Sequence, residues 1–70
     1  MNQSTQNQLV DQLLPRRTVE KQAGISRATV YRLMKAGKFP HPVSIGTGAV
    51  RWKQSDITAW QQSLVSTAGV

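Results

Sequence analysis

The sequence lacks cysteine and has very little negative charge. Without cysteine it has no disulfide, no thiolate metal site and no cysteine nucleophile. Its single histidine, His41, stands between two prolines and is a poor basis for a metal site or a Ser/His/Asp triad. Only three acids, Asp11, Glu20 and Asp56, oppose nine Lys and Arg. We therefore expect no cofactor, no metal and no enzymatic activity.

Long apolar runs are also missing. No stretch approaches the roughly 20 apolar residues of a membrane span. The chain does not open with a charged segment followed by an apolar one, as a signal peptide would. We expect a soluble protein in the bacterial cytoplasm. Seventy residues make one small domain at most, which favours a binding function over a catalytic cleft.

What the sequence does have is positive charge. The formal net charge is +6 and the pI is about 11.0. Such a surplus on a small surface attracts polyanions, nucleic acid above all. The alternative is a basic surface with no ligand.

Composition divides the chain into three parts. Residues 1–12 are mostly Asn, Gln, Ser and Thr and predict a disordered polar arm. Residues 13–65 carry the domain, and residues 66–70 predict a frayed tail. At the junction, four apolar residues at helical spacing indicate a short helix or turn that Pro15 ends: Leu9, Val10, Leu13 and Leu14.

Two helices with a tight glycine turn follow. Thr18 is the expected cap of the first, which carries Val19 and Ala23 on one face and stops at Gly24. Ile25 lies at the turn, where it is placed to plug the core.

Ser26 caps the second helix, which runs to about Ala36 and stops at Gly37. Its apolar residues Val30, Leu33 and Met34 are spaced i, i+3, i+4. Two helices joined in this way are typical of a helix-turn-helix.

The remaining pattern predicts a hairpin and a last helix. Residues 43–45 and 50–52 alternate like strands around a Gly46–Gly48 loop, which makes a wing over 43–53. Ser55 is the expected cap of the last helix, with Asp56 in its first turn. We assign Trp52 and one face of this helix to the core: Ile57, Trp60 and Leu64. The fold class is mostly α with a small β-hairpin, a winged helix-turn-helix.

The second helix is the candidate recognition helix, over residues 26–36. Without its apolar stripe it leaves a set of polar, basic and small residues: Ser26, Arg27, Ala28, Thr29, Tyr31, Arg32 and Lys35. A helix fits the major groove of DNA, and Arg32 can make a bidentate contact with guanine. The hydroxyls suit phosphate oxygens. The alternative is a solvated face with ordinary charges.

Further candidate DNA contacts lie on the wing and before the first helix. On the wing side these are Lys38, Gly46, Thr47, Gly48 and Arg51. A thin glycine tip can approach the DNA backbone or minor groove. Arg16, Arg17 and Lys21 are candidates for phosphate contacts, whereas Lys53 is at most a flanking charge.

These residues together resemble the AlpA-like phage and prophage regulators. The resemblance lies in Gly24–Met34, Gly37–Pro40 and Pro42-Val43, and it continues through Trp52, Ser55-Asp56-Ile57 and Trp60. It covers roughly residues 13–65 and implies a MerR-like or excisionase-like winged helix from a mobile element. Such proteins regulate transcription of integrase or excision genes, and some act as recombination directionality factors. The resemblance places the Gly46–Gly48 tip and Arg51 on the wing, and it places five residues on the recognition helix: Ser26, Arg27, Thr29, Tyr31 and Arg32.

One recognition helix reads only about three to five base pairs, too few for a unique genomic address. We therefore expect a dimer, tandem copies, or a partner such as an integrase; a transcription activator would instead need RNA polymerase. The sequence has no coiled coil, which favours self-association templated by DNA. A different class of function stays open: a protein-interaction module whose basic face docks an acidic partner.

The charge pattern makes a first prediction. If about six cations neutralise phosphates, log affinity for duplex DNA falls with log salt at a slope of roughly −5. A titration of binding against salt measures this slope. A flat dependence would contradict a phosphate-based interface.

Overall fold

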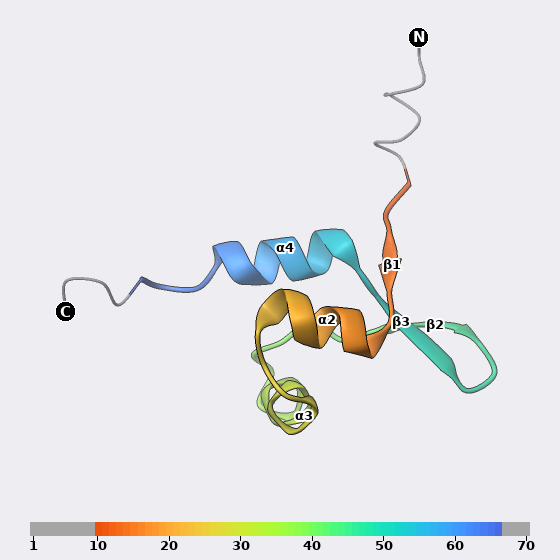
Figure 1. Ribbon diagram of the computed structural model, residues 1–70, viewed down its shortest axis with the longest axis horizontal. Coiled ribbons are helices and arrows are strands. Elements are labelled where there is room, and N and C mark those ends of the chain that lie inside the picture. Colours follow the sequence, from red (N-terminus) through yellow and green to blue (C-terminus); the bar gives the residue numbers. More distant parts are fainter. Residues whose placement is uncertain (1–9, 67–70) are drawn as a thin grey trace, which may run out of the picture.

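The computed structural model describes residues 10–66. Its elements are β1 (Leu13–Leu14), α2 (Arg16–Ala23), α3 (Arg27–Lys35), β2 (Val43–Gly46), β3 (Ala49–Lys53) and α4 (Gln54–Gln62). In Figure 1, α2 lies between α4 and α3, and the β2–β3 hairpin extends away from the helices. The fold class predicted from the sequence is confirmed. No helix between residues 10 and 66 is long and apolar enough to cross a membrane.

The sheet has three antiparallel strands in the order β1-β3-β2. The hairpin was expected, and it turns at Thr47 and Gly48 with Gly46 opposite Ala49. A register shift between Ser44 and Gly46 leaves Ile45 as an extra residue, a bulge that bends β2.

The strand β1 corrects the prediction of a helix or turn before Pro15. Leu14 pairs with Trp52 and is buried, whereas Leu13 pairs with Lys53 and is 44% exposed. This alternation is that of a strand. Proline pushes the residue before it into extended backbone, and β3 offers an unpaired edge there. Leu9 lies outside the described residues.

The core takes one side chain from nearly every element. Its buried members are Leu14, Val19, Val30, Phe39, Trp52 and Ile57. They come from β1, α2, α3, the loop after α3, β3 and α4 respectively. Ile25, Leu33, Met34 and Trp60 pack against them while partly exposed.

Two indole N–H groups hold the loop after α3. Trp52 Nε1 donates to the Pro40 carbonyl at 2.9 Å, and Trp60 Nε1 donates to the Lys38 carbonyl at 3.0 Å. Phe39, between these two carbonyls, meets the Trp60 ring edge-on at 4.8 Å between centroids. The predicted core positions of Trp52 and Ile57 are confirmed, and Trp60 sits at the edge of the core.

Leu64 was wrongly assigned to the core, since it is 55% exposed. The helix α4 ends at Gln62, so Leu64 no longer follows the helical face that carries Ile57 and Trp60.

The two predicted glycine stops are confirmed. Gly24 and Gly37 adopt φ of +70° and +73°, a region that favours glycine. After α3, the Gly37 N–H donates to the Met34 carbonyl at 3.0 Å and the Lys38 N–H to the Leu33 carbonyl at 2.8 Å. This pair of bonds is the Schellman motif.

The predicted start of the first helix is three residues too late. The helix begins at Arg16 after Pro15, whose backbone is extended, and the Thr18 side chain caps nothing. The fixed φ and missing N–H of proline suit a residue at the start of a helix, and the Pro15 carbonyl accepts from the Val19 N–H at 3.1 Å.

The helix α4 is capped from outside, not by Ser55. It begins at Gln54, and Lys53 before it provides no side-chain cap. The Asp11 carboxylate instead accepts from the Ser55 N–H at 3.1 Å and from the Ser55 hydroxyl. The Gln54 N–H donates to the Gln12 carbonyl at 2.8 Å. The last two residues of the predicted polar arm thus bind the start of α4, and positions 1–9 of that arm lie outside the described residues.

The contrast between Ile57 and Leu64 gives a stability prediction. Ile57→Ala lowers the free energy of unfolding by about 2–5 kcal/mol because it empties a buried site, whereas Leu64→Ala changes it by less than about 0.5 kcal/mol. Chemical denaturation of both variants measures the difference. Equal losses would place Leu64 back in the core.

The Asp11 cap makes stability depend on pH. Hydrogen bonds from the Ser55 hydroxyl and N–H, with nearby Lys53, hold the pKa of Asp11 below its ordinary value of 3.8. Because the folded pKa is depressed, the stabilisation is present above the ordinary value and is lost as pH falls through the folded one. We expect Asp11→Asn to have a lower Tm than wild type near neutral pH. The two melting curves should converge in acid, and a constant gap would contradict the assignment.

Candidate nucleic-acid interface

The outer face of α3 is polar and basic because its apolar stripe points inward. Val30 is fully buried, and Leu33 and Met34 pack against the core. Of the remaining predicted residues, Thr29 is half-buried. The others are exposed: Ser26, Arg27, Ala28, Tyr31, Arg32 and Lys35. The helix carries no acid.

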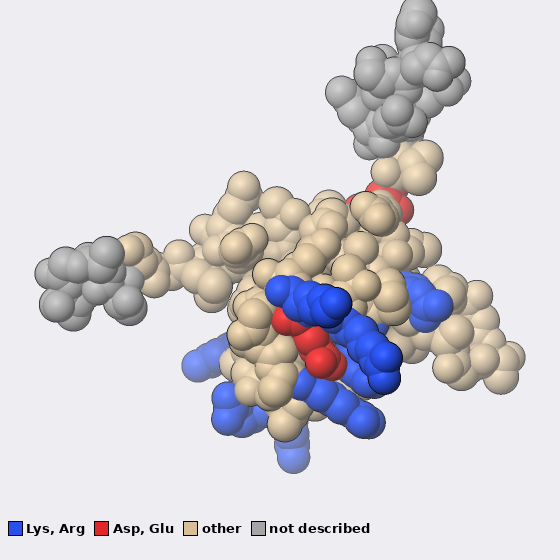
Figure 2. Space-filling model, in the orientation of Figure 1, with Lys and Arg blue, Asp and Glu red and all other residues tan. Residues whose placement is uncertain are grey.

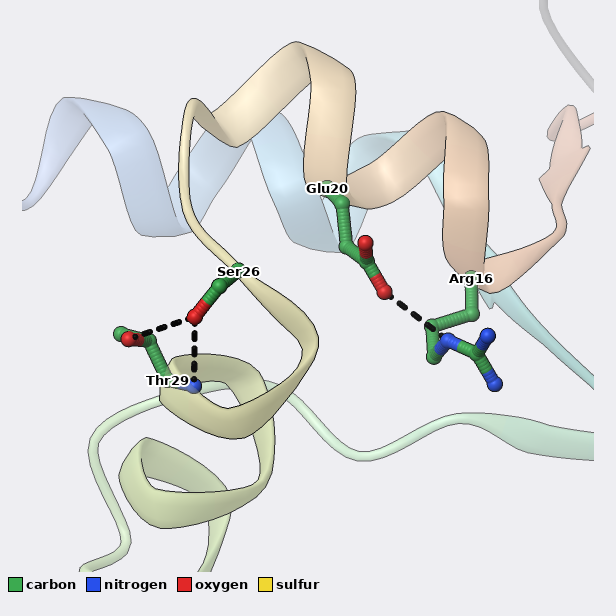
Figure 3. Close-up of polar contacts among 4 residues, drawn as sticks. All are labelled: Arg16, Glu20, Ser26 and Thr29. Atoms are coloured by element: carbon green, nitrogen blue, oxygen red, sulfur yellow. Dashed lines mark hydrogen bonds and ion pairs between the residues drawn. The ribbon is translucent and has the colours of Figure 1, made fainter.

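The start of α3 is held by Ser26, as predicted. Its hydroxyl oxygen accepts from the Thr29 N–H at 3.2 Å and donates to Thr29 Oγ1 at 3.1 Å (Figure 3). The Ser26 hydroxyl is therefore engaged within the cap. Among the described residues the hydroxyl hydrogen of Thr29 has no acceptor, which leaves it available to a phosphate oxygen.

Arginines on α3 differ in their freedom. The Arg27 guanidinium lies over the Tyr31 ring, 5.9 Å from its centroid, a cation–π arrangement that restrains both side chains. Arg32 makes no side-chain hydrogen bond or ion pair within residues 10–66, so its donors are all available.

The first turn of α2 carries Arg16 and Arg17, both predicted as phosphate contacts. Arg16 Nε donates to Glu20 Oε2 at 2.8 Å, with the two side chains 33% and 23% exposed (Figure 3). The pKa of Arg16 is raised, first by the hydrogen bond to Glu20 and also by the Tyr31 hydroxyl. The Arg16 side chain therefore lies between α2 and α3, and its guanidinium stays charged.

A shallow groove lies between the start of α2 and the hairpin. Its volume is about 400 Å³ and its lining is Pro15, Arg16, Arg17, Gly48, Ala49, Val50 and Arg51. Arg51 Nη1 donates to the Val50 carbonyl at 2.8 Å, which ties this guanidinium to its own strand. Three arginines that are as far apart in sequence as 16 and 51 thus border one concave surface.

The basic side chains are unevenly distributed over the face seen in Figure 2. Figure 2 shows Lys and Arg gathered over α2, α3 and the base of the hairpin, while the region of α4 in the same view carries none. Gly46 and Thr47 lie at the exposed tip and do not line the groove, in contrast to Gly48. Lys38 is exposed beyond the end of α3. Contact of any of these residues with DNA stays a prediction.

A family model described as "Prophage CP4-57 regulatory protein (AlpA)" matches residues 12–65. The chain belongs to the AlpA family. This confirms the resemblance in the sequence, and it makes the chain a member of a phage regulatory family. Among curated proteins, the uncharacterized protein ORF88 of Enterobacteria phage P4 is 42% identical over 43 residues. That alignment covers 61% of this chain and 49% of ORF88, so the chain spans about half of the relative's length. No solved structure is significantly similar.

Sequence reasoning missed two residues of this AlpA-family chain that shape its surface. Glu20 was counted only as one of three acids, although its position four residues after Arg16 signals a helical ion pair. Asp11 had no such signal, because its partner Ser55 is 44 residues away.

Proposed function

We propose that this chain is a sequence-specific double-stranded DNA-binding protein of a phage or mobile element. The helix α3 enters the major groove, and the β2–β3 hairpin lies on the flank of the site. The observation that carries the proposal is the outer face of α3, which is exposed, acid-free and basic.

The reading of bases falls to residues spaced along that face. Ala28, Arg32 and Lys35 follow i, i+4, i+7 and line one side of the helix. The small Ala28 permits close approach to the base edges. Arg32, whose donors have no partner among the described residues, makes a bidentate contact with guanine O6 and N7.

Backbone contacts position that helix. Arg16, Arg17 and Arg51 border the groove between α2 and the hairpin, and phosphate oxygens are the acceptors that suit them. The hairpin tip at Gly46 and Thr47 lies outside the groove lining and brings the wing to the adjacent backbone or minor groove. Contacts on both sides of α3 fix its register on the duplex.

The biological role is transcriptional regulation, excision of the element, or both. A short footprint requires a dimer, tandem copies assembled on DNA, or a protein partner such as integrase or RNA polymerase. Closely spaced direct repeats would indicate excisionase assembly. A single or palindromic promoter site would indicate a regulator.

Selection from a random duplex library at near-physiological salt tests the proposal. Enrichment of a short motif is the expected result, and the number and spacing of its copies separate the two roles. Salt-sensitive binding without an enriched motif would indicate that the protein binds DNA non-specifically or that a partner supplies its specificity. Absence of binding would favour docking of the basic face on an acidic protein.

Replacing Arg32 gives the sharpest single-residue prediction. Arg32→Ala weakens binding to the selected duplex by about 1–3 kcal/mol and relaxes the preference at one base pair. Fluorescence anisotropy on cognate duplexes and single-base variants measures both effects. Lys53→Ala is the matched control, since it removes the same charge from a residue that pairs with Leu13 in the sheet. Wild-type discrimination by Arg32→Ala would refute the assigned role of α3.

A further inference from the structure

The ion pair between Arg16 and Glu20 is misplaced for a contribution to helix stability. The positive end of the helix dipole favours acids, yet the first turn of α2 has none and carries Arg16 and Arg17. The acid follows the base at i+4, which is the weaker order for a helical ion pair. Both side chains are partly exposed, and pairs of this kind add little stability. Charge arrangements that oppose the helix dipole in this way occur mainly at functional sites.

The geometry of the pair leaves one edge of the guanidinium unused by Glu20. The carboxylate takes the Nε–H, and Figure 3 shows the two terminal nitrogens of Arg16 on the side away from Glu20. Arg16 also lines the groove with Arg17 and Arg51. The Tyr31 hydroxyl also lies beside this guanidinium. Held from two sides, Arg16 presents its terminal N–H donors in a fixed direction, and two parallel N–H donors form a fork that matches two oxygens of a phosphate.

We propose that Glu20 is a positioning residue for DNA binding: by holding Arg16 Nε, it aims the terminal edge of Arg16 at a backbone phosphodiester in the groove between α2 and β3. This inference rests on the proposed function. It gives an acid on the DNA-facing side a favourable role, where its charge alone is repulsive. The restraint lowers the conformational entropy that the long Arg16 side chain loses on binding.

The proposal predicts that the effect of Glu20→Ala on duplex affinity changes sign when Arg16 is removed. In the wild-type background Glu20→Ala weakens duplex binding by about three- to ten-fold, because Arg16 must be ordered when DNA binds. In the Arg16→Ala background the same change tightens binding by at most about two-fold, because only the repulsion between Glu20 and phosphate is removed. Glu20→Gln, whose amide oxygen still accepts from Nε–H, restores most of the wild-type affinity.

Asp56→Asn provides the matched control. It raises the net charge by the same amount, on α4, a helix that carries no Lys or Arg. We expect it to tighten binding slightly in both backgrounds. Anisotropy titrations on the selected duplex measure all variants at one salt concentration, and thermal melts compare their folding. We expect Glu20→Ala to melt close to the wild type.

Three results would overturn the role of Glu20. Glu20→Ala tightening binding as Asp56→Asn does would reduce Glu20 to a repulsive charge. Equal weakening with and without Arg16, or a large loss of Tm, would make its role structural. No rescue by Gln would show that acceptance from Nε–H is not what matters. If the wild-type chain itself bound no duplex, the proposed function would fall together with this inference.

Discussion

The domain depends on the complete burial of Trp52 in the central strand. Its ring fills the middle of a core to which other elements add one residue each. Its N–H must find an acceptor, because an unpaired buried donor costs about 1–3 kcal/mol. The acceptor is the Pro40 carbonyl, so the loop that follows α3 is tied to the sheet. That tie sets α3 against the hairpin, and thereby places two groups of basic side chains on the same side of the domain.

The first turn of α2 carries charges that do not stabilise the fold. Two arginines at the positive end of a helix repel one another and the helix dipole, and among the described residues only Arg16 of the two is paired with an acid, Glu20. An anion arriving from outside would relieve this repulsion. In the free protein this repulsion lowers the stability of the domain, as unfavourable local arrangements do at many binding sites.

The elements that were predictable from the sequence are those defined by local signals. The glycine stops, the Ser26 cap, the hairpin and the buried Trp52 all follow from neighbouring residues or a simple period. Two of the errors arose where distant residues decide. Leu13 and Leu14 form a strand because β3 pairs with them, and Ser55 receives its acceptor from Asp11 across 44 positions. The candidate site follows the same division: the face of α3 was predictable, whereas the groove that unites Arg16 and Arg51 depends on the tertiary fold.

Because α3 contributes only Val30 to the fully buried core, most of its surface is free of structural duty. Five exposed residues on its outer side can be exchanged without emptying the core: Arg27, Ala28, Tyr31, Arg32 and Lys35. Substitutions at these positions can change what the helix binds without emptying a buried site. The fold thus separates the residues that determine what α3 can bind from those that determine whether the domain folds.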